Sequence, residues 1–216
     1  MNRPNALLPA FRPTPSSEHE QPPFIVLEGV SGIGKSTLAR LLARRLNGTA
    51  LHTLADPHNT WSKAVAQQME ALPQIAFYLS GLLHVSDLIR NALAHGPVIA
   101  DRYAPSVTAR QAAIHSVNPS DVDALIAPFH RYLLTPDHTF YLRCSEHTLR
   151  ERMAVKDDTK QDDTDLFDIP GRLKTLIANF ETVAAGDHTA VILDTDGMDP
   201  EDLADVITDH MERAHA

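Results

Sequence analysis

Short apolar runs alternate along this chain with longer stretches in which apolar residues recur every three or four positions. The runs are too short for helices, which predicts strands buried on both faces of a sheet. Helical spacing follows the runs, as in Leu38, Leu41, Leu42 and Leu46. Strands that alternate with helices predict a parallel sheet with a ligand site at the carboxyl ends of the strands. The five predicted strands are 24–27, 50–53, 98–101, 139–142 and 190–193.

Proline and small polar residues set the predicted helix ends. Pro73 is expected to separate a helix over 61–72 from a long helix over 74–94, because proline removes a hydrogen bond inside a helix. Ser120 and Ser145 are predicted N-caps. Asp199 and Pro200 are expected to start the last helix. The other helices are predicted over 38–46, 105–114, 120–129, 145–153 and 173–183.

Two segments show no such periodicity. Residues 1–22 are rich in proline and polar side chains, so we expect a disordered tail with no role in export. The polar and acidic stretch 156–168 predicts a mobile lid over about 153–168. The folded domain is expected to span 23–216.

Composition narrows the class of protein. The 216 residues suit one α/β domain. A net charge of −9 argues against a nucleic-acid polymer as partner, although one nucleotide needs only a local positive pocket. The single cysteine, Cys144, fits a reducing cytoplasm. No apolar stretch approaches the roughly 20 residues of a membrane span, so we expect a cytoplasmic protein without a membrane partner.

A glycine-rich sequence follows the first predicted strand. Residues 29–36 read Gly-Val-Ser-Gly-Ile-Gly-Lys-Ser, which matches G-x-x-x-x-G-K-[ST] between a strand and a helix. Such a loop points backbone N–H groups at a β-phosphate, its lysine at the β- and γ-oxygens, and its hydroxyl at Mg²⁺. The predicted ATP-binding residues are Gly29, Ser31, Gly32, Ile33, Gly34, Lys35, Ser36 and Thr37.

The third predicted strand ends in an acidic residue. Val98 to Asp101 has the form of a Walker B strand, so Asp101 is expected to hold Mg²⁺ opposite Ser36. Arg102 follows it and is placed to neutralise phosphoryl oxygens. We predict a catalytic role for Lys35, Asp101 and Arg102, with Mg²⁺ as cofactor and ATP as phosphoryl donor.

These motifs resemble those of thymidylate kinases. Residues 99–111, Ile-Ala-Asp-Arg-Tyr-Ala-Pro-Ser-Val-Thr-Ala-Arg-Gln, are similar to the D-R-Y-x-x-S-x-x-A-Y-Q signature of that family. Residues 24–46 resemble its E-G-x-x-G-x-G-K-[ST] opening, and 136–152 resemble the strand and helix that lead into its lid.

The resemblance implies a three-layer P-loop NTPase fold: a five-stranded parallel sheet flanked by helices, with a mobile lid. It also implies ATP-dependent phosphorylation of a nucleoside monophosphate and a homodimer. Arg152, beside the predicted lid, is our choice for a further catalytic cation. On the acceptor side the resemblance points to Phe77, Tyr78, Arg102, Tyr103, Ser106 and Gln111.

The chain departs from this family mainly on the acceptor side. On the long helix the family reads F-Y-A-A-R, whose arginine contacts thymine, and this chain reads Phe-Tyr-Leu-Ser-Gly over 77–81. Gly81 therefore stands where that arginine would lie, which leaves the base of the acceptor open. Ser31 stands where the family has an acid, and 55–59 replace its R-E-P-G-G segment.

A second family is similar at the acceptor side. Residues 56–61, Asp-Pro-His-Asn-Thr-Trp, resemble the E-P-x-x-x-W segment of deoxynucleoside kinases, in which the acid is the general base and the tryptophan lines the nucleoside pocket. Asp56 and Trp61 are candidates for these roles. A nucleoside hydroxyl benefits from such a base, whereas a monophosphate already offers an ionised oxygen. Asp56 equally fits an ordinary Asp-Pro turn, and Trp61 fits a helix core position.

The predicted function is transfer of the γ-phosphate of ATP to a nucleoside monophosphate. A nucleoside kinase with Asp56 as base and a kinase of another hydroxylated metabolite are the enzyme alternatives. A nucleotide-binding switch is the non-enzyme alternative. The chain has no N-K-x-D guanine-reading motif and retains Lys35, Ser36 and Asp101, which favours an enzyme.

Overall fold

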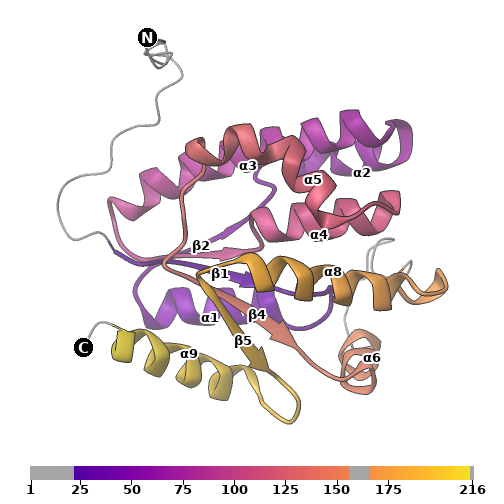
Figure 1. Ribbon diagram of the computed structural model, residues 1–216. Helices are drawn as coiled ribbons and strands as arrows, with labels where there is room; N and C mark the ends of the chain where they lie inside the picture. The colour runs from indigo at the N-terminus through magenta and orange to yellow at the C-terminus, as the bar shows by residue number, and fades with distance from the viewer. Residues whose placement is uncertain (1–21, 156–165, 215–216) are drawn as a thin grey trace.

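The computed structural model describes residues 22–155 and 166–214. Within them, five parallel strands form a sheet in the order β2-β3-β1-β4-β5 (Figure 1). All five predicted strands are present, and the third matches its predicted bounds. The strands are β1 Phe24–Glu28, β2 Thr49–His52, β3 Val98–Asp101, β4 His138–Arg143 and β5 Ala190–Asp194.

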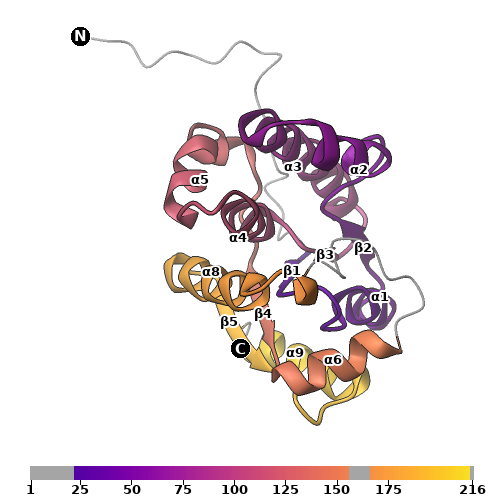
Figure 2. The same ribbon diagram turned by 90° about the vertical axis from the view of Figure 1, so that its right-hand side faces the viewer.

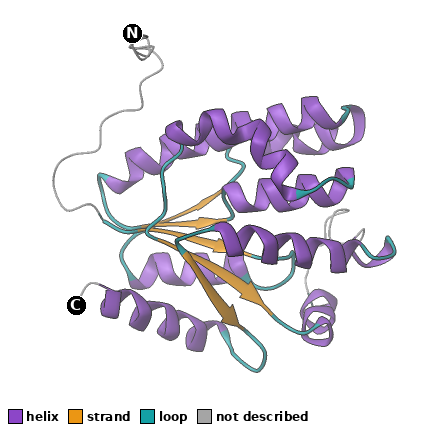
Figure 3. Cartoon of the chain, in the orientation of Figure 1, coloured by secondary structure: helices purple, strands orange, loops and turns teal. Residues whose placement is uncertain are grey.

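Helices cover both faces of the sheet, as Figures 1 and 3 show. Helices α3, α4 and α8 lie on one face, and α1 and α9 lie on the other. The strands fan out toward their arrowheads, which all point to the side of the sheet on which α6 lies (Figures 1 and 3). The helices are α1 Lys35–Arg45, α2 His58–Gln68, α3 Ala71–Leu93, α4 Ala104–His115, α5 Pro119–Ile126, the 3₁₀ helix η2 Ala127–Tyr132, α6 Glu146–Ala154, α8 Arg172–Gly186 and α9 Pro200–Ala214.

The core lies on both sides of β1, whose residues are all buried. Successive side chains of a strand point to opposite faces. Phe24 and Val26 accordingly join the apolar cluster of α3, while Ile25 and Leu27 join the cluster that includes α1 and α9. The strand that leads into the glycine-rich loop is therefore held rigidly from both faces.

Two predicted helix boundaries are wrong. Pro73 does not separate two helices: α2 ends at Gln68, and Pro73 lies in the first turn of α3. Proline is tolerated there because the N–H groups of a first turn have no partner within the helix. The N-cap of α5 is Asn118 rather than Ser120, and it forms a capping box with Asp121. Ser145 caps α6 as predicted, accepting a hydrogen bond from the Thr148 N–H.

Helix α3 is more apolar than the sequence analysis expected. Over an 18-residue window its mean hydropathy is 1.2, enough by length and composition for a membrane span. In the fold it lies against the sheet, where Leu82, Val85 and Ile89 are fully buried. Packing against the sheet accounts for its composition.

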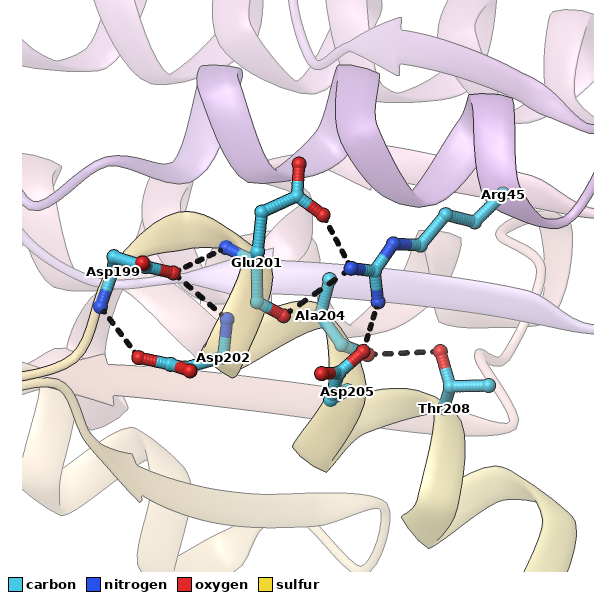
Figure 4. Close-up of polar contacts among 7 residues, drawn as sticks. All are labelled: Arg45, Asp199, Glu201, Asp202, Ala204, Asp205 and Thr208. Atoms are coloured by element: carbon cyan, nitrogen blue, oxygen red, sulfur yellow. Dashed lines mark hydrogen bonds and ion pairs between the residues drawn. The ribbon is translucent and has the colours of Figure 1, made fainter.

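Helix α9 begins where the sequence predicts and is tied to α1 (Figure 4). The Asp199 carboxylate accepts hydrogen bonds from the N–H groups of Glu201 at 2.8 Å and Asp202 at 2.9 Å. Arg45 of α1 reaches the carboxylates of Glu201 and Asp205. Because these ion pairs are largely exposed, they orient the helix more than they stabilise it.

The predicted tail, 1–22, lies outside the described residues except for its last residue. The predicted lid, 153–168, is described only at its two ends. Both therefore stay predictions.

Candidate functional site

A cavity of about 710 Å³ opens at the carboxyl ends of the strands, the edge that faces the viewer in Figure 2. Its walls come from the glycine-rich loop, the ends of β2 and β3, and helices α1, α2, α3, α4 and α6. The structure thus brings most of the predicted site together. The predicted residues that line the cavity are Ser31, Gly32, Ile33, Gly34, Lys35, Ser36, Thr37, Tyr78, Asp101, Arg102, Ser106, Gln111 and Arg152.

The other predicted site residues lie elsewhere in the described part of the chain. Tyr103 is only 2% exposed, and its ring packs 5.4 Å from that of Phe24 in the core. The Phe77 ring lies 5.2 Å from the imidazole of His58. Gly29 is buried, and a Cβ there would meet the Leu142 carbonyl oxygen at 2.6 Å.

Helix α2 presents residues other than the predicted ones to the cavity. Trp61 is 56% exposed, and the exposed Asp56 accepts a hydrogen bond from the Thr60 hydroxyl at 2.9 Å. Asn59 and Ser62, three positions apart on one face of α2, line the cavity instead. The sequence indicated a helix here but not which face the fold would turn inward.

The glycine-rich loop has the backbone form that a phosphate needs. Gly32 and Gly34 have φ values of 85° and 109°, in the left-handed region that glycine adopts without strain. At Gly32 a Cβ would overlap the Met153 sulfur at 2.2 Å, so α6 packs directly on the loop. Successive N–H groups in such a turn form a concave anion site at the start of α1.

Lys35 is buried at the base of this loop. Its Nζ donates to the Val30 carbonyl oxygen at 2.7 Å. Burial and the nearby Arg102 lower the pKa of Lys35 well below its ordinary value, although Asp101 and Glu28 oppose the shift. An anion beside this ammonium would favour its charged form and offset the cost of its burial. Such a buried lysine is what a phosphate-binding site requires.

Ser36 and Asp101 form a pair that fits a magnesium ion. The Ser36 hydroxyl donates to Asp101 Oδ2, and Asp101 Oδ1 is buried with no hydrogen-bond partner among the described residues. Burial would raise the pKa of Asp101, but Lys35 and the Ser36 hydrogen bond outweigh it and lower the pKa. An ionised carboxylate with one oxygen unused and a neighbouring hydroxyl suit a cation that takes its other ligands from phosphates and water.

Arg102 connects the glycine-rich loop to α4. Its Nη1 donates to the Gly29 carbonyl oxygen at 2.9 Å and to the Ser106 hydroxyl at 3.0 Å. Its Nη2 donates to the Ser31 hydroxyl at 3.0 Å. The residue has a φ of 74°, an uncommon conformation for a side chain of this size and one that clusters at functional sites.

Arg152 holds α6 against the glycine-rich loop. Its Nη1 donates to the Ile33 carbonyl oxygen at 3.0 Å and to the Thr195 hydroxyl at 2.8 Å. Its Nη2 donates to the Thr195 carbonyl oxygen at 2.7 Å. These contacts give Arg152 a positioning role, and its catalytic role stays a prediction.

Sequence reasoning missed Glu28, which fastens α4 to the glycine-rich loop. The buried carboxylate accepts hydrogen bonds from the N–H groups of Tyr103 at 2.8 Å and Ser106 at 3.1 Å, and from the Ser106 hydroxyl. Burial raises the pKa of Glu28 to about 7, although Ser106 and Arg102 lower it in part. An acidic residue ending a wholly apolar strand was the available signal.

We predict that Glu28 makes stability depend on pH. Its folded pKa lies above its unfolded value of 4.5, so between these values the native state binds more protons than the unfolded state. The free energy of unfolding of the wild type, relative to Glu28→Gln, should therefore fall as pH rises from 4.5 to about 7, by at most about 1.4 kcal/mol per pH unit, and level off above that. Urea unfolding at several pH values measures this, and parallel curves would contradict it.

Comparison with known proteins agrees with this geometry. The thymidylate kinase family model matches residues 27–197. The chain belongs to the thymidylate kinase family. Membership confirms the prediction of an ATP-dependent nucleotide kinase, made from the glycine-rich loop and the Asp101-Arg102-Tyr103 segment.

Several family members align over much of their length. The chain is 31% identical over 140 residues to a probable thymidylate kinase of Methanocaldococcus jannaschii, covering 62% of this chain and 71% of that protein. A probable thymidylate kinase of Methanococcoides burtonii is 29% identical over 184 residues, covering 80% of this chain and 88% of the relative.

Two solved structures share the fold. A thymidylate kinase from Candida albicans superposes with a TM-score of 0.73 at 17% identity, covering 90% of this chain and 93% of that one. A deoxyadenosine kinase from M. mycoides superposes with a TM-score of 0.64 at 17% identity, covering 88% and 99%. The predicted three-layer P-loop fold is thereby confirmed, and both families that the sequence resembles share it.

Proposed function

We propose that this thymidylate kinase family member transfers the γ-phosphate of ATP to the phosphate of a nucleoside monophosphate. The observation that carries the proposal is the contrast between Arg102 and Asp56. The Arg102 guanidinium lines the cavity beside the glycine-rich loop, where an acceptor phosphate would need a cation. Asp56, the candidate base of a nucleoside kinase, is exposed outside the cavity lining and hydrogen-bonded to Thr60.

The residues divide the work of transfer between donor and acceptor. The glycine-rich loop and Lys35 hold the β- and γ-phosphates of ATP, while Arg102 brings an ionised acceptor oxygen toward the γ-phosphorus. The new O–P bond forms as the bond to the β-phosphate oxygen breaks, and ADP leaves. Ser36 and Asp101 would hold Mg²⁺, which supplies charge neutralisation on the phosphate oxygens.

The acceptor side of the cavity differs from the thymine-reading pattern for a steric reason. A Cβ on Gly81 would lie 2.9 Å from Leu54 Cδ2 and 3.4 Å from the His58 ring. At this point α3 therefore approaches Leu54 and the start of α2 closely. We propose that Asn59, Ser62 and Gln111 meet the base instead of an arginine. Neutral amides and hydroxyls both donate and accept hydrogen bonds, so this wall suits a polar base edge.

The acceptor class is tested by ADP release from ATP and Mg²⁺ with matched nucleosides and 5′-monophosphates. We expect turnover with at least one monophosphate and little with its nucleoside. Turnover confined to nucleosides would overturn the proposal in favour of the nucleoside kinase alternative. We further propose a cytoplasmic homodimer, and a monomeric mass by light scattering would contradict its dimeric part.

Replacement of Asp56 is expected to have little effect. Asp56→Asn keeps the side-chain oxygen that accepts the Thr60 hydrogen bond. Because an ionised monophosphate needs no base, kcat should change by less than about threefold. The kcat of the variant with the best monophosphate acceptor measures this. A loss of a hundredfold or so would instead make Asp56 a general base, within the usual size of that effect.

A further inference from the structure

The segment that joins β2 to α2 is fastened along one face of α3. His58 Nε2 lies 2.8 Å from the Ser80 hydroxyl oxygen, within hydrogen-bond distance. His84 Nε2 donates to the Asp56 carbonyl oxygen at 3.2 Å. Ser80 and His84 are four positions apart and therefore neighbours on the helix surface. The path of residues 54–58 is thus set by this face of α3.

Gly81 lies on the same face, in the interior of α3. Glycine in a helix interior is less stable than alanine, so its presence there usually reflects a close approach of another group. The backbone of Gly81 is ordinary helix, without a positive φ, so it would accept an L side chain. Only the neighbours of Gly81 therefore oppose a larger residue.

The two neighbours of Gly81 differ in how far they can yield. A Cβ would lie 3.4 Å and 3.5 Å from two ring carbons of His58, and that ring is held by Ser80 and packs 5.2 Å from Phe77. These separations are close to ordinary contact between carbon atoms. At 2.9 Å from Leu54 Cδ2 the added carbon would be far too close. Because this methyl group ends a rotatable side chain, Leu54 is the residue that would move.

Leu54 is part of the cavity wall on the acceptor side. It lines the cavity together with Asn59 and Ser62, which follow it in the chain, and with Tyr78 of α3. Asn59 and Ser62 are polar, so Leu54 supplies apolar surface to this part of the wall. Ligand pockets typically combine apolar surface, which buries the ligand, with a few polar groups that orient it.

We propose that Gly81 is a positioning residue for the acceptor, and that it acts through Leu54. Because Gly81 has no side chain, Leu54 packs against the backbone of α3 and presents its apolar surface to the base or sugar of the acceptor. This inference rests on the proposed function, which assigns this end of the cavity to the acceptor. The sequence comparison marked position 81 only as one that lacks an arginine, whereas the packing gives the glycine a role of its own.

Gly81→Ala tests the inference by adding the single carbon that Leu54 would have to avoid. The probes are ATP and the 5′-monophosphate that the wild type phosphorylates best. KM for the monophosphate should rise about tenfold, the lower end of the effect of one methylene in an apolar pocket. KM for ATP should stay within about twofold of the wild type, and kcat should change less than KM, because the residues around the transferred phosphate are untouched.

Gly186→Ala is the matched control. Gly186 ends α8, and a Cβ there would meet no atom within 4 Å. This variant makes the same chemical change in open space, so both KM values should stay at those of the wild type. Thermal melting of each variant identifies any loss of fold.

A second substitution tests whether Gly81 acts through Leu54. Leu54→Ala removes the methyl group that the added carbon would meet, and it should itself raise KM for the monophosphate because the wall loses apolar surface. Adding Gly81→Ala to Leu54→Ala should then raise this KM by less than about twofold more, since the two changes share one contact. The double variant also keeps the test informative if Gly81→Ala alone does not fold.

Three results would overturn the inference. An unchanged KM for the monophosphate in Gly81→Ala would show that the glycine does not shape the acceptor wall. Equal rises in both KM values would indicate a general disturbance of the site. A double variant whose KM reflects the product of the two single effects would separate Gly81 from Leu54.

The turnover of the wild type keeps this inference separate from the proposed function. If the wild type phosphorylates a monophosphate, any of these three results leaves the proposed function standing. If the wild type phosphorylates only nucleosides, the proposed function fails. The same variants assayed with the preferred nucleoside then decide the role of Gly81 by the same criteria.

Discussion

Lys35→Ala is expected to lower kcat at least about a hundredfold, the loss that follows removal of a positioned electrostatic donor from an active site. The Lys35 ammonium is buried and fixed by the Val30 carbonyl, so no other group takes its place when the side chain is cut back. Its charge is the one that the glycine-rich loop brings to the β- and γ-oxygens. Steady-state ADP release measures the loss.

The same variant should not unfold the protein. Burial disfavours the charged form of Lys35, as its lowered pKa records, so removing the ammonium relieves a desolvation cost. We therefore expect a Tm no lower than that of the wild type. Lys63→Ala removes an exposed lysine of α2 and serves as the control, with unchanged kcat. Near-normal turnover of Lys35→Ala would show that the glycine-rich loop does not hold the transferred phosphate.

The parts of the site that depend on neighbouring residues could be predicted from the sequence. The glycine-rich loop is one continuous segment between a strand and a helix, so the spacing of its residues is enough to predict its backbone geometry. The strand Val98–Asp101 matches its predicted bounds because four residues, buried on both faces, leave little freedom of register. The sheet edge then places Asp101 beside Ser36.

The parts that depend on distant residues could not be predicted. Glu28 acts on N–H groups 75 and 78 positions away, and Arg110 meets Ser31 across 79 positions. No local pattern encodes such contacts, because they exist only once α4 packs beside β1. The sequence likewise did not determine which face of α2 points into the cavity. The rotation of the helix about its axis decides whether Trp61 or the pair Asn59 and Ser62 lines it.

Asp101→Asn is expected to give the other large loss, about 10²- to 10³-fold in kcat at low Mg²⁺. The change keeps the shape of the side chain and leaves the backbone carbonyl that accepts from the Thr53 N–H and hydroxyl, both at 3.3 Å. It removes the negative charge of the carboxylate, whose Oδ1 has no hydrogen-bond partner among the described residues. Because a neutral amide is a weaker ligand for a hard cation, higher Mg²⁺ should restore part of the activity.

The dependence on Mg²⁺ separates a metal ligand from a structural residue. The lowered pKa of Asp101 means that its ionised form stabilises the fold above its unfolded pKa of 3.8, and this stabilisation is lost as pH falls through the folded value. Asp101→Asn should therefore also lower Tm at neutral pH. Asp194→Asn, at the exposed end of β5, is the matched control and should leave both properties near wild type. If Asp101→Asn lost turnover but needed no more Mg²⁺ than the wild type, the Asp101 carboxylate would serve only to orient Ser36, and the predicted metal site would be wrong.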